Sequence, residues 1–134
     1  MKTLKLSMFI ALVAITFSAC KKDATETIVG SWNTDDGGSI TFNADGTGTT
    51  QDSEFFEFDC GTLNGNRIGP IPSFSWEVRN NGTNDNLFMA FEDSTSFVSP
   101  CSGNMEFPVK FTSKNKGQVG NDILIDISVD LTRK

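Results

Sequence analysis

The chain contains no histidine and no tyrosine among its 134 residues. Without histidine, the Ser-His-Asp and Cys-His nucleophilic systems and histidine-ligated metal catalysis are excluded. A carboxylate pair of the glycosidase kind remains conceivable, but no motif distinguishes two members of the available pool, which consists of Glu54, Glu57, Asp59, Glu77 and Glu92. We therefore predict a protein that is not an enzyme and that needs no metal and no cofactor.

Long hydrophobic runs are also missing, because the longest, Leu6 to Phe17, is shorter than the about 20 apolar residues that span a bilayer. This run follows Lys2 and Lys5 and leads to Ser18-Ala19-Cys20, which resembles the lipobox of bacterial lipoproteins. The resemblance predicts that the signal peptide 1–19 is removed and that Cys20 carries the lipid. Residues 20–27 then form the lipidated cysteine and a polar tether, and 28–134 form one domain attached to, but not spanning, a membrane.

The residues after the cysteine bear on the location of the protein. Lys21 stands where an aspartate would favour retention in the inner membrane, so we expect an outer-membrane lipoprotein of the cell envelope. Lys21 to Asp23 also partly resembles the surface-export signal of Bacteroidetes lipoproteins, which leaves both the periplasmic face and the cell surface open.

Basic residues are scarce, with 11 Lys and Arg against 17 Asp and Glu and a net charge of −6 that becomes more negative once the signal is removed. They are spread from Lys21 to Lys134 without a dense patch, so nucleic acid is not an expected partner. The acidity favours solubility, and we predict a monomer.

The remaining composition favours strands, because apolar residues alternate between turn signals and no window after Gly30 keeps helical spacing. The last segment has the longest single-faced row, which runs from Ile123 to Leu131. An all-β, antiparallel up-and-down meander of about eight strands follows, closed into a barrel that removes exposed edges. The expected strands are Ile28–Asn33, Ser39–Asn43, Gly48–Gln51, Ser73–Asn80, Asn86–Glu92, Ser96–Val98, Met105–Thr112 and Asp122–Thr132.

Three motifs carry a family resemblance: Gly30-Ser31-Trp32, the hairpin Ser39 to Gly48, and Phe74-Ser75-Trp76. Together they are similar to the lipocalin-like domains of bacterial lipoproteins, although the Thr-Asp-Tyr motif and a C-terminal helix are lacking. The resemblance implies that Gly30, Trp32 and Arg133 are structural, with the Trp32 ring lying across the barrel floor beneath the Arg133 guanidinium as a cation–π pair.

Two functions from different classes follow from this interpretation. In the favoured one, the barrel interior binds a small apolar or amphipathic ligand, lined by some of Phe42, Phe55, Phe74, Trp76, Met89, Phe91, Phe107 and Phe111. In the alternative, those side chains fill the barrel core, and the protein is an envelope interaction or structural module that recognises a protein or glycan through its loops.

Two cysteines remain once Cys20 carries lipid. Cys60 and Cys101 form an even pair in an exported domain, which predicts a disulfide between the loops 59–72 and 94–103. A redox or metal site is the other interpretation of the pair, but the spacing is not CxxC and the chain offers no histidine as a ligand.

Overall fold

Eight antiparallel strands close into a barrel, which confirms the predicted all-β up-and-down meander. The computed structural model describes residues 23–58, 62–63, 66–67, 71–93, 101–121 and 127–134. Around the barrel each strand lies beside its neighbour in sequence, and β1 pairs with β10 to complete the closure. The barrel strands are β1 (Gly30–Thr34), β2 (Ser39–Phe42), β3 (Thr47–Gln51), β6 (Ser73–Asn80), β7 (Asp85–Asp93), β8 (Cys101–Ser113), β9 (Lys116–Asn121) and β10 (Ile127–Arg133).

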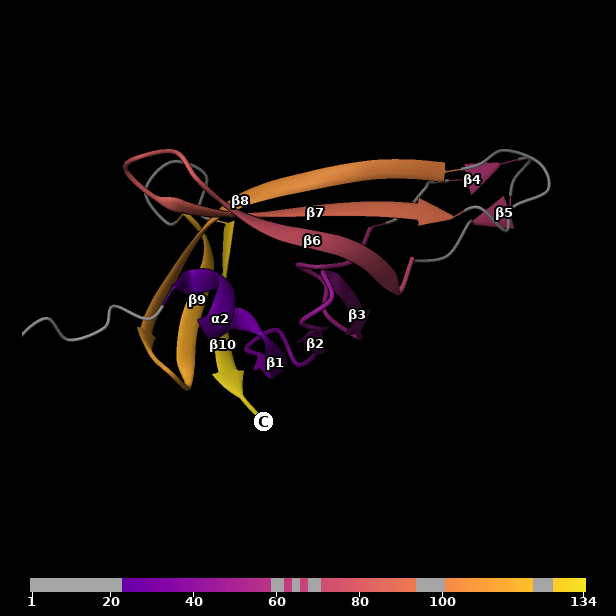
Figure 1. Cartoon of the computed structure of the whole chain (residues 1–134). Coiled ribbons are helices and arrows are strands. Elements are labelled where there is room, and N and C mark those ends of the chain that lie inside the picture. The colour runs from indigo at the N-terminus through magenta and orange to yellow at the C-terminus, as the bar shows by residue number, and fades with distance from the viewer. Residues whose placement is uncertain (1–22, 59–61, 64–65, 68–70, 94–100, 122–126) are drawn as a thin grey trace, which may run out of the picture.

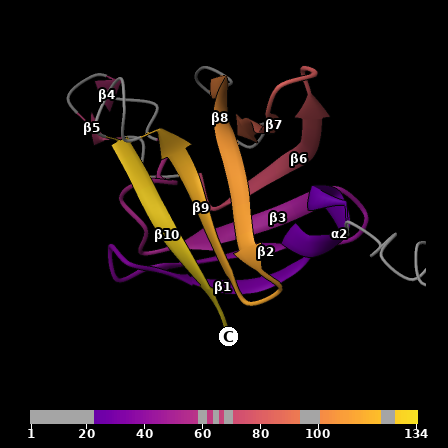
Figure 2. The same ribbon diagram turned by 90° about the vertical axis from the view of Figure 1, so that its left-hand side faces the viewer.

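Two short elements lie outside the barrel sheet. The helix α2 (Ala24–Ile28) precedes β1, and β4 (Thr62–Leu63) pairs with β5 (Asn66–Arg67) within the connection from β3 to β6. In Figure 1 the long strands β6, β7 and β8 run across the top of the view, with β1, β2 and β3 below them. Figure 2 shows β8, β9 and β10 crossing in front of β1, β2 and β3.

Three expectations about the strands were wrong. Lys116–Asn121 is a strand that the sequence did not predict, since Val119 is its one large apolar residue; backbone pairing with both β8 and β10 forms it. The first strand begins at Gly30 and not at Ile28, which ends α2. The predicted inward row of β10 is buried only at Val129 and Leu131, because Ile127 lies at the end of the barrel and is 49% exposed. The expected strand Ser96–Val98 falls outside the described residues, as do Ile123 and Ile125.

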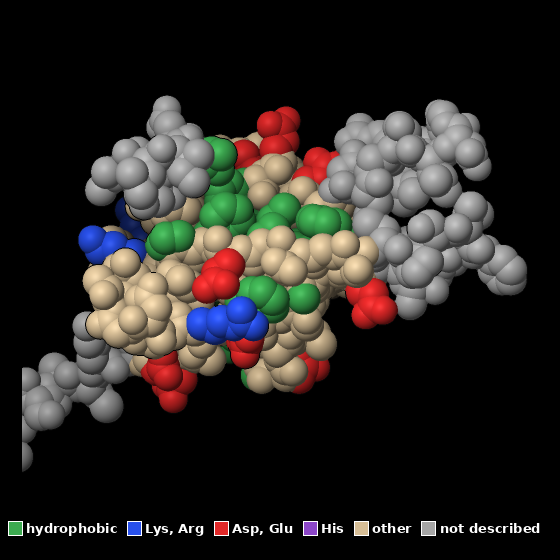
Figure 3. All heavy atoms as spheres, turned by 90° about the horizontal axis from the view of Figure 1, so that it is seen from above, with side chains coloured by type: hydrophobic (Ala, Val, Ile, Leu, Met, Phe, Trp, Pro, Cys, Tyr) green, Lys and Arg blue, Asp and Glu red, His purple; other side chains and the backbone are tan. Residues whose placement is uncertain are grey.

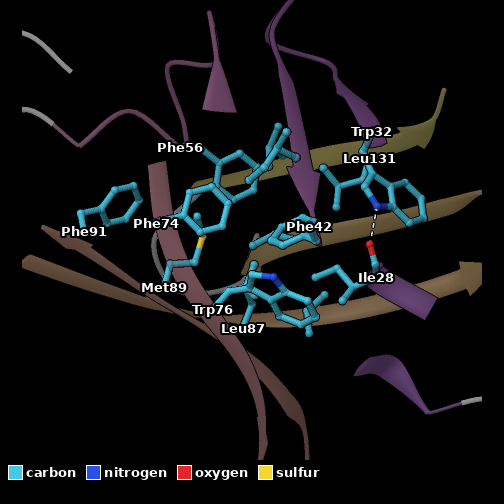
Figure 4. Packing of buried hydrophobic residues seen from close by; sticks show 14 of the residues in the cluster. Ile28, Trp32, Phe42, Phe56, Phe74, Trp76, Leu87, Met89, Phe91 and Leu131 are labelled. Atoms are coloured by element: carbon cyan, nitrogen blue, oxygen red, sulfur yellow. Dashed lines mark hydrogen bonds between the residues drawn. The ribbon is translucent and has the colours of Figure 1, made fainter. Parts of the chain in front are cut away.

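The helix α2 closes one end of the barrel, although residues 20–27 were predicted to be a tether. Asp23 caps the helix by accepting a hydrogen bond from the Thr25 amide at 3.2 Å. Ala24, Thr27 and Ile28 are buried, and the Trp32 indole N–H donates to the Ile28 carbonyl at 2.7 Å, the dashed line in Figure 4. A helix of five residues is too short for its apolar face to be recognised in a sequence.

Arg133, at the end of β10, fastens this helix to the barrel. Its Nη1 and Nη2 donate to the carbonyl oxygens of Val29 and Thr27 at 2.9 and 2.6 Å, and its Nε donates to that of Lys114 at 3.0 Å. The guanidinium carbon lies 4.3 Å from the Trp32 ring centroid, so the contact that the lipocalin resemblance implied is present. We call this end of the barrel, formed by α2, Gly30, Trp32 and Arg133, the floor.

Gly30 is required at the floor for two reasons. Its φ of +132° is a conformation that residues with a side chain rarely adopt, and a Cβ there would collide with Nη1 of Arg133. Close approach of the guanidinium to the backbone therefore depends on the missing side chain.

Replacing Gly30 with alanine should lower the free energy of unfolding by about 1–3 kcal/mol, because it adds backbone strain and displaces the Arg133 guanidinium. The matched control is Gly37→Ala, where φ is also positive, at +95°, but no atom lies within 4 Å of the added Cβ. Urea unfolding followed by tryptophan fluorescence measures both. If both variants lost the same free energy of unfolding, the collision with Arg133 would cost nothing beyond the backbone strain, and its role at Gly30 would be contradicted.

Arg133→Lys should lower the free energy of unfolding by about 1–3 kcal/mol, because a single ammonium cannot reproduce the fork of hydrogen bonds to three carbonyls. Arg79→Lys is the control: Arg79 lies on the barrel exterior, where it pairs with Glu77 and Glu106, and its side chain is 45% exposed. We expect that control to cost less than about 1 kcal/mol in the same denaturation experiment. A loss for Arg133→Lys no larger than the control's would contradict the role of the fork.

Candidate functional site

The predicted ligand-lining side chains divide into a buried and a partly buried group. Phe42, Phe74, Trp76, Met89 and Phe91 are at most 7% exposed and belong to the hydrophobic core. Phe55, Phe107 and Phe111 are partly buried and pack against that core. The inward orientation expected from the alternating pattern is therefore present, and Figure 4 shows several of these side chains converging inside the barrel.

The buried group makes contacts among its own members and with neighbouring residues. The Phe42 ring lies edge-on to Trp76 and Phe74, with centroids 5.4 and 5.8 Å apart. Phe91 stacks on Phe58 at 5.0 Å, and the Trp76 indole N–H donates to the Thr47 carbonyl at 2.8 Å. A side chain on the wall of a water-sized void keeps accessible surface there, and these side chains keep almost none. Their packing favours the filled core over an internal pocket.

A cleft lies instead at the surface, where the chain leaves β3. It encloses about 140 Å³ and is lined by Thr50, Asp52, Ser53, Glu57 and Pro72. β1 and β3 both run from the floor to the opposite end of the barrel, which we call the rim. We therefore call this cleft the rim cleft. Its polar lining groups include the carboxylates of Asp52 and Glu57, while the Thr50 hydroxyl is buried and the Ser53 hydroxyl donates to Asp36. The carboxylates suit a group that donates hydrogen bonds, such as an amine, a guanidinium or a sugar hydroxyl.

The backbone around the rim cleft is held by specific contacts. Asp52 has φ of +57°, the one positive value outside glycine among the described residues, and this turns the chain away from β3. The Thr50 amide donates to the Pro72 carbonyl at 2.8 Å, and the Ile71 amide donates to the Phe58 carbonyl at 3.0 Å. These two bonds join both sides of the cleft and give it a defined shape.

Asp36, in the turn between β1 and β2, pins the cleft wall to the barrel. Its Oδ2 accepts from the Ser53 hydroxyl at 2.7 Å and the Phe55 amide at 3.0 Å. Its Oδ1 accepts from the Thr34 hydroxyl and the Gly38 amide. Partial burial acts to raise the pKa of Asp36, but the hydrogen bonds outweigh it and hold the pKa below the usual value of 3.8. No pattern in the sequence marked this carboxylate, because its partners come together only in the fold.

The other predicted site residues are placed as follows. Cys20 and Cys60 lie outside the described residues, and Cys101 begins β8 without a described side chain, so the lipidation and the disulfide stay predictions. Of the carboxylate pool, Glu57 lines the rim cleft, whereas Glu77 pairs with Arg79 on the barrel exterior. Asp59 also falls outside the described part of the chain.

Metal binding needs a cluster of ligand side chains, and a membrane-spanning helix needs a long apolar segment. Within the described ranges, no three side chains of the metal-binding types lie close enough together to hold an ion. No helix in that same part of the chain is both long and apolar enough to cross a bilayer.

Fold and site together define an all-β protein, built on a closed eight-stranded meander with a helix at one end and an acidic cleft at the other. No family model, no curated protein and no solved structure matches the chain.

Asp36→Asn should destabilise the protein at neutral pH and matter less in acid. The pKa of Asp36 is lowered in the folded state, so its stabilising effect is present above the unfolded value of about 3.8 and is lost as pH falls toward the folded value. Urea unfolding of wild type and variant between about pH 3 and 7 measures this. The two curves should converge at the acidic end, and a constant difference across the range would contradict the assignment.

Proposed function

We propose that this chain is a lipid-anchored lipoprotein of the bacterial cell envelope whose lipocalin-like barrel is a packed scaffold, and that it recognises a protein or glycan through the rim cleft. The observation that carries the proposal is the burial of Phe42, Met89 and Phe91, at most 1% exposed and in contact with other core side chains. With the interior occupied by its own residues, recognition falls to the surface. The absence of histidine supports binding without catalysis.

The chemistry of the rim cleft indicates what the partner presents. Asp52 and Glu57 face a space of about 140 Å³, which is enough for one side chain or part of a sugar ring. The carboxylates accept hydrogen bonds and attract positive charge, and the Pro72 ring supplies an apolar surface beside them. A lysine or arginine side chain, or the hydroxyls of a sugar, would fit this combination.

A small apolar ligand remains the second candidate, and Ile127 is the observation that favours it. Val109, Val119 and Val129 pair across β8, β9 and β10 and are buried. Two residues further toward the rim, Phe107 is partly buried and Ile127 is 49% exposed on the same side of the sheet. Figure 3, which looks down on the side of the molecule where β6, β7 and β8 run in Figure 1, shows a separate group of hydrophobic side chains in the middle of that face. A ligand of this kind would lie on the rim and not inside the barrel.

Native mass spectrometry of the protein purified from its own host separates the two candidates. A packed scaffold that recognises a macromolecule should release no bound small molecule. A co-purifying apolar compound, lost in the variant Ile127→Ser, would overturn the first proposal in favour of the second.

The variant Asp52→Asn/Glu57→Gln tests the cleft directly. Binding to the partner, identified in the host by photo-crosslinking from position 51 beside the cleft, should weaken about tenfold or more, because two charged acceptors are removed. Glu26→Gln, at the other end of the barrel, and Met89→Leu, an interior change of similar volume, should leave the affinity unchanged. Near-UV circular dichroism checks that each variant folds. An unchanged affinity in the double variant would contradict the cleft as the recognition site.

A further inference from the structure

Three exposed lysines gather at the floor. Lys114 lies in the turn between β8 and β9, Lys116 begins β9, and Lys134 follows β10. The Arg133 amide donates to the Asn115 carbonyl and the Lys134 amide to the Ser31 carbonyl, both at 3.0 Å, which holds these segments together. We call Lys114, Lys116 and Lys134 the floor lysines.

Among the described residues, no ion pair involves the floor lysines. The ion pairs there join Arg79 to Glu77 and Glu106, on the exterior of β6 and β8, and involve none of the three. Arg133 is different, since its guanidinium is engaged with three carbonyls and the Trp32 ring. Arg133 therefore positions the floor, whereas the three lysines are exposed.

Acidic side chains gather at the opposite end. β1 begins at the floor with Gly30, and the turn that follows its last residue carries Asp35 and Asp36. The segment after β3 adds Asp52 and Glu57, which line the rim cleft, and Glu54 between them in sequence. The floor also carries carboxylates, because Asp23 and Glu26 belong to the start of α2, and Asp45 lies in the turn that follows Phe42, the residue paired with Gly30. The floor lysines stand beside these carboxylates, whereas the rim cleft is lined by carboxylates and by no lysine.

The chain leads from the floor to the proposed anchor over a very short distance. Ala24 starts α2 and is buried, so the folded part begins four residues after Cys20. Four residues reach at most about 14 Å even when fully extended. In the sequence, Lys21 and Lys22 occupy that interval. A lipid on Cys20 would keep the floor close to the headgroups.

We propose that the floor lysines contact the phosphates of anionic lipids in the leaflet that holds the Cys20 lipid, and that this contact orients the barrel with its rim cleft away from the membrane. The inference rests on the proposed anchoring. Attraction of lysines to an anionic surface acts within a Debye length of about 8 Å at physiological ionic strength. The tether keeps the floor within reach of that attraction, and the same surface repels the acidic rim. Orientation of this kind would present the rim cleft to partners outside the membrane.

The test uses the lipidated mature protein in two kinds of vesicle, phosphatidylcholine alone and phosphatidylcholine with about 30% phosphatidylglycerol. A water-soluble amine-reactive ester labels the lysines, and mass spectrometry measures the labelling rate of each. The substitution Gln51→Lys, at the exposed end of β3, introduces a reference lysine at the opposite end of the barrel. The floor lysines should label at least about threefold more slowly in the anionic vesicles than in the neutral ones, and about 0.5 M salt should abolish the difference. The reference lysine should label equally in both.

The charge-reversal variant Lys114→Glu/Lys116→Glu completes the design. Labelling of Lys134 in this variant should lose its dependence on anionic lipid, while near-UV circular dichroism shows whether the fold is retained. Equal rates for the floor lysines in both vesicles would overturn the inference, and so would protection that extends to the reference lysine, since that indicates adsorption without orientation.

Failure of the anchoring can be told apart from failure of the contact in the same samples. An intact mass without the lipid on Cys20 would overturn the anchor and the orientation together. Loss of partner binding in the cleft variant Asp52→Asn/Glu57→Gln has no bearing on lysine protection, so the recognition proposal and the membrane contact stand or fall separately.

Discussion

Closure of the barrel brings the first and last strands together, and the Arg133 guanidinium is the group on which that junction depends. It satisfies the carbonyls of Thr27 and Val29, which a helix leaves without partners at its C-terminal end. It also covers the Trp32 ring, whose N–H in turn holds the Ile28 carbonyl. One side chain thus links β10, β1 and α2, and Gly30 makes room for it. Without this junction the barrel would have two open edges and no floor.

Because the core side chains pack inside the barrel, the distinctive surfaces of this protein lie at the two ends of the barrel. At one end, α2 and Arg133 cover Trp32, and the floor lysines lie beside the junction. At the other end, Asp36 accepts hydrogen bonds from Ser53 and Phe55 in the segment that follows β3, and these bonds hold one wall of the rim cleft. The proposed recognition at the rim and the proposed membrane contact at the floor involve different surfaces, so each set of residues can be altered independently.

Period-two alternation predicted most strands because an antiparallel sheet with one buried face imposes that period on the side chains. It failed where burial does not follow local composition. β9 has only Val119 to signal it and forms because β8 and β10 present their backbone groups on either side. Likewise α2 is too short to show helical spacing. Of the site, Glu57 was among the carboxylates named from the sequence, but Asp52 was not. The pairing of Asp36 with Ser53 spans a separation that no local pattern records.

From the residues alone follow the all-β class, the meander, the inward faces of β6 and β7, and the lack of histidine chemistry, because each depends on composition or on neighbours along the chain. Only the tertiary structure decided what the inward faces do. Whether Phe42, Trp76 and Phe91 line a pocket or fill it depends on the distance across the barrel between side chains from different strands, and the structure brings them into contact. It likewise decided that Lys114, Lys116 and Lys134 gather at the floor and that a cleft lies at the rim, since strand connections determine which turns share an end.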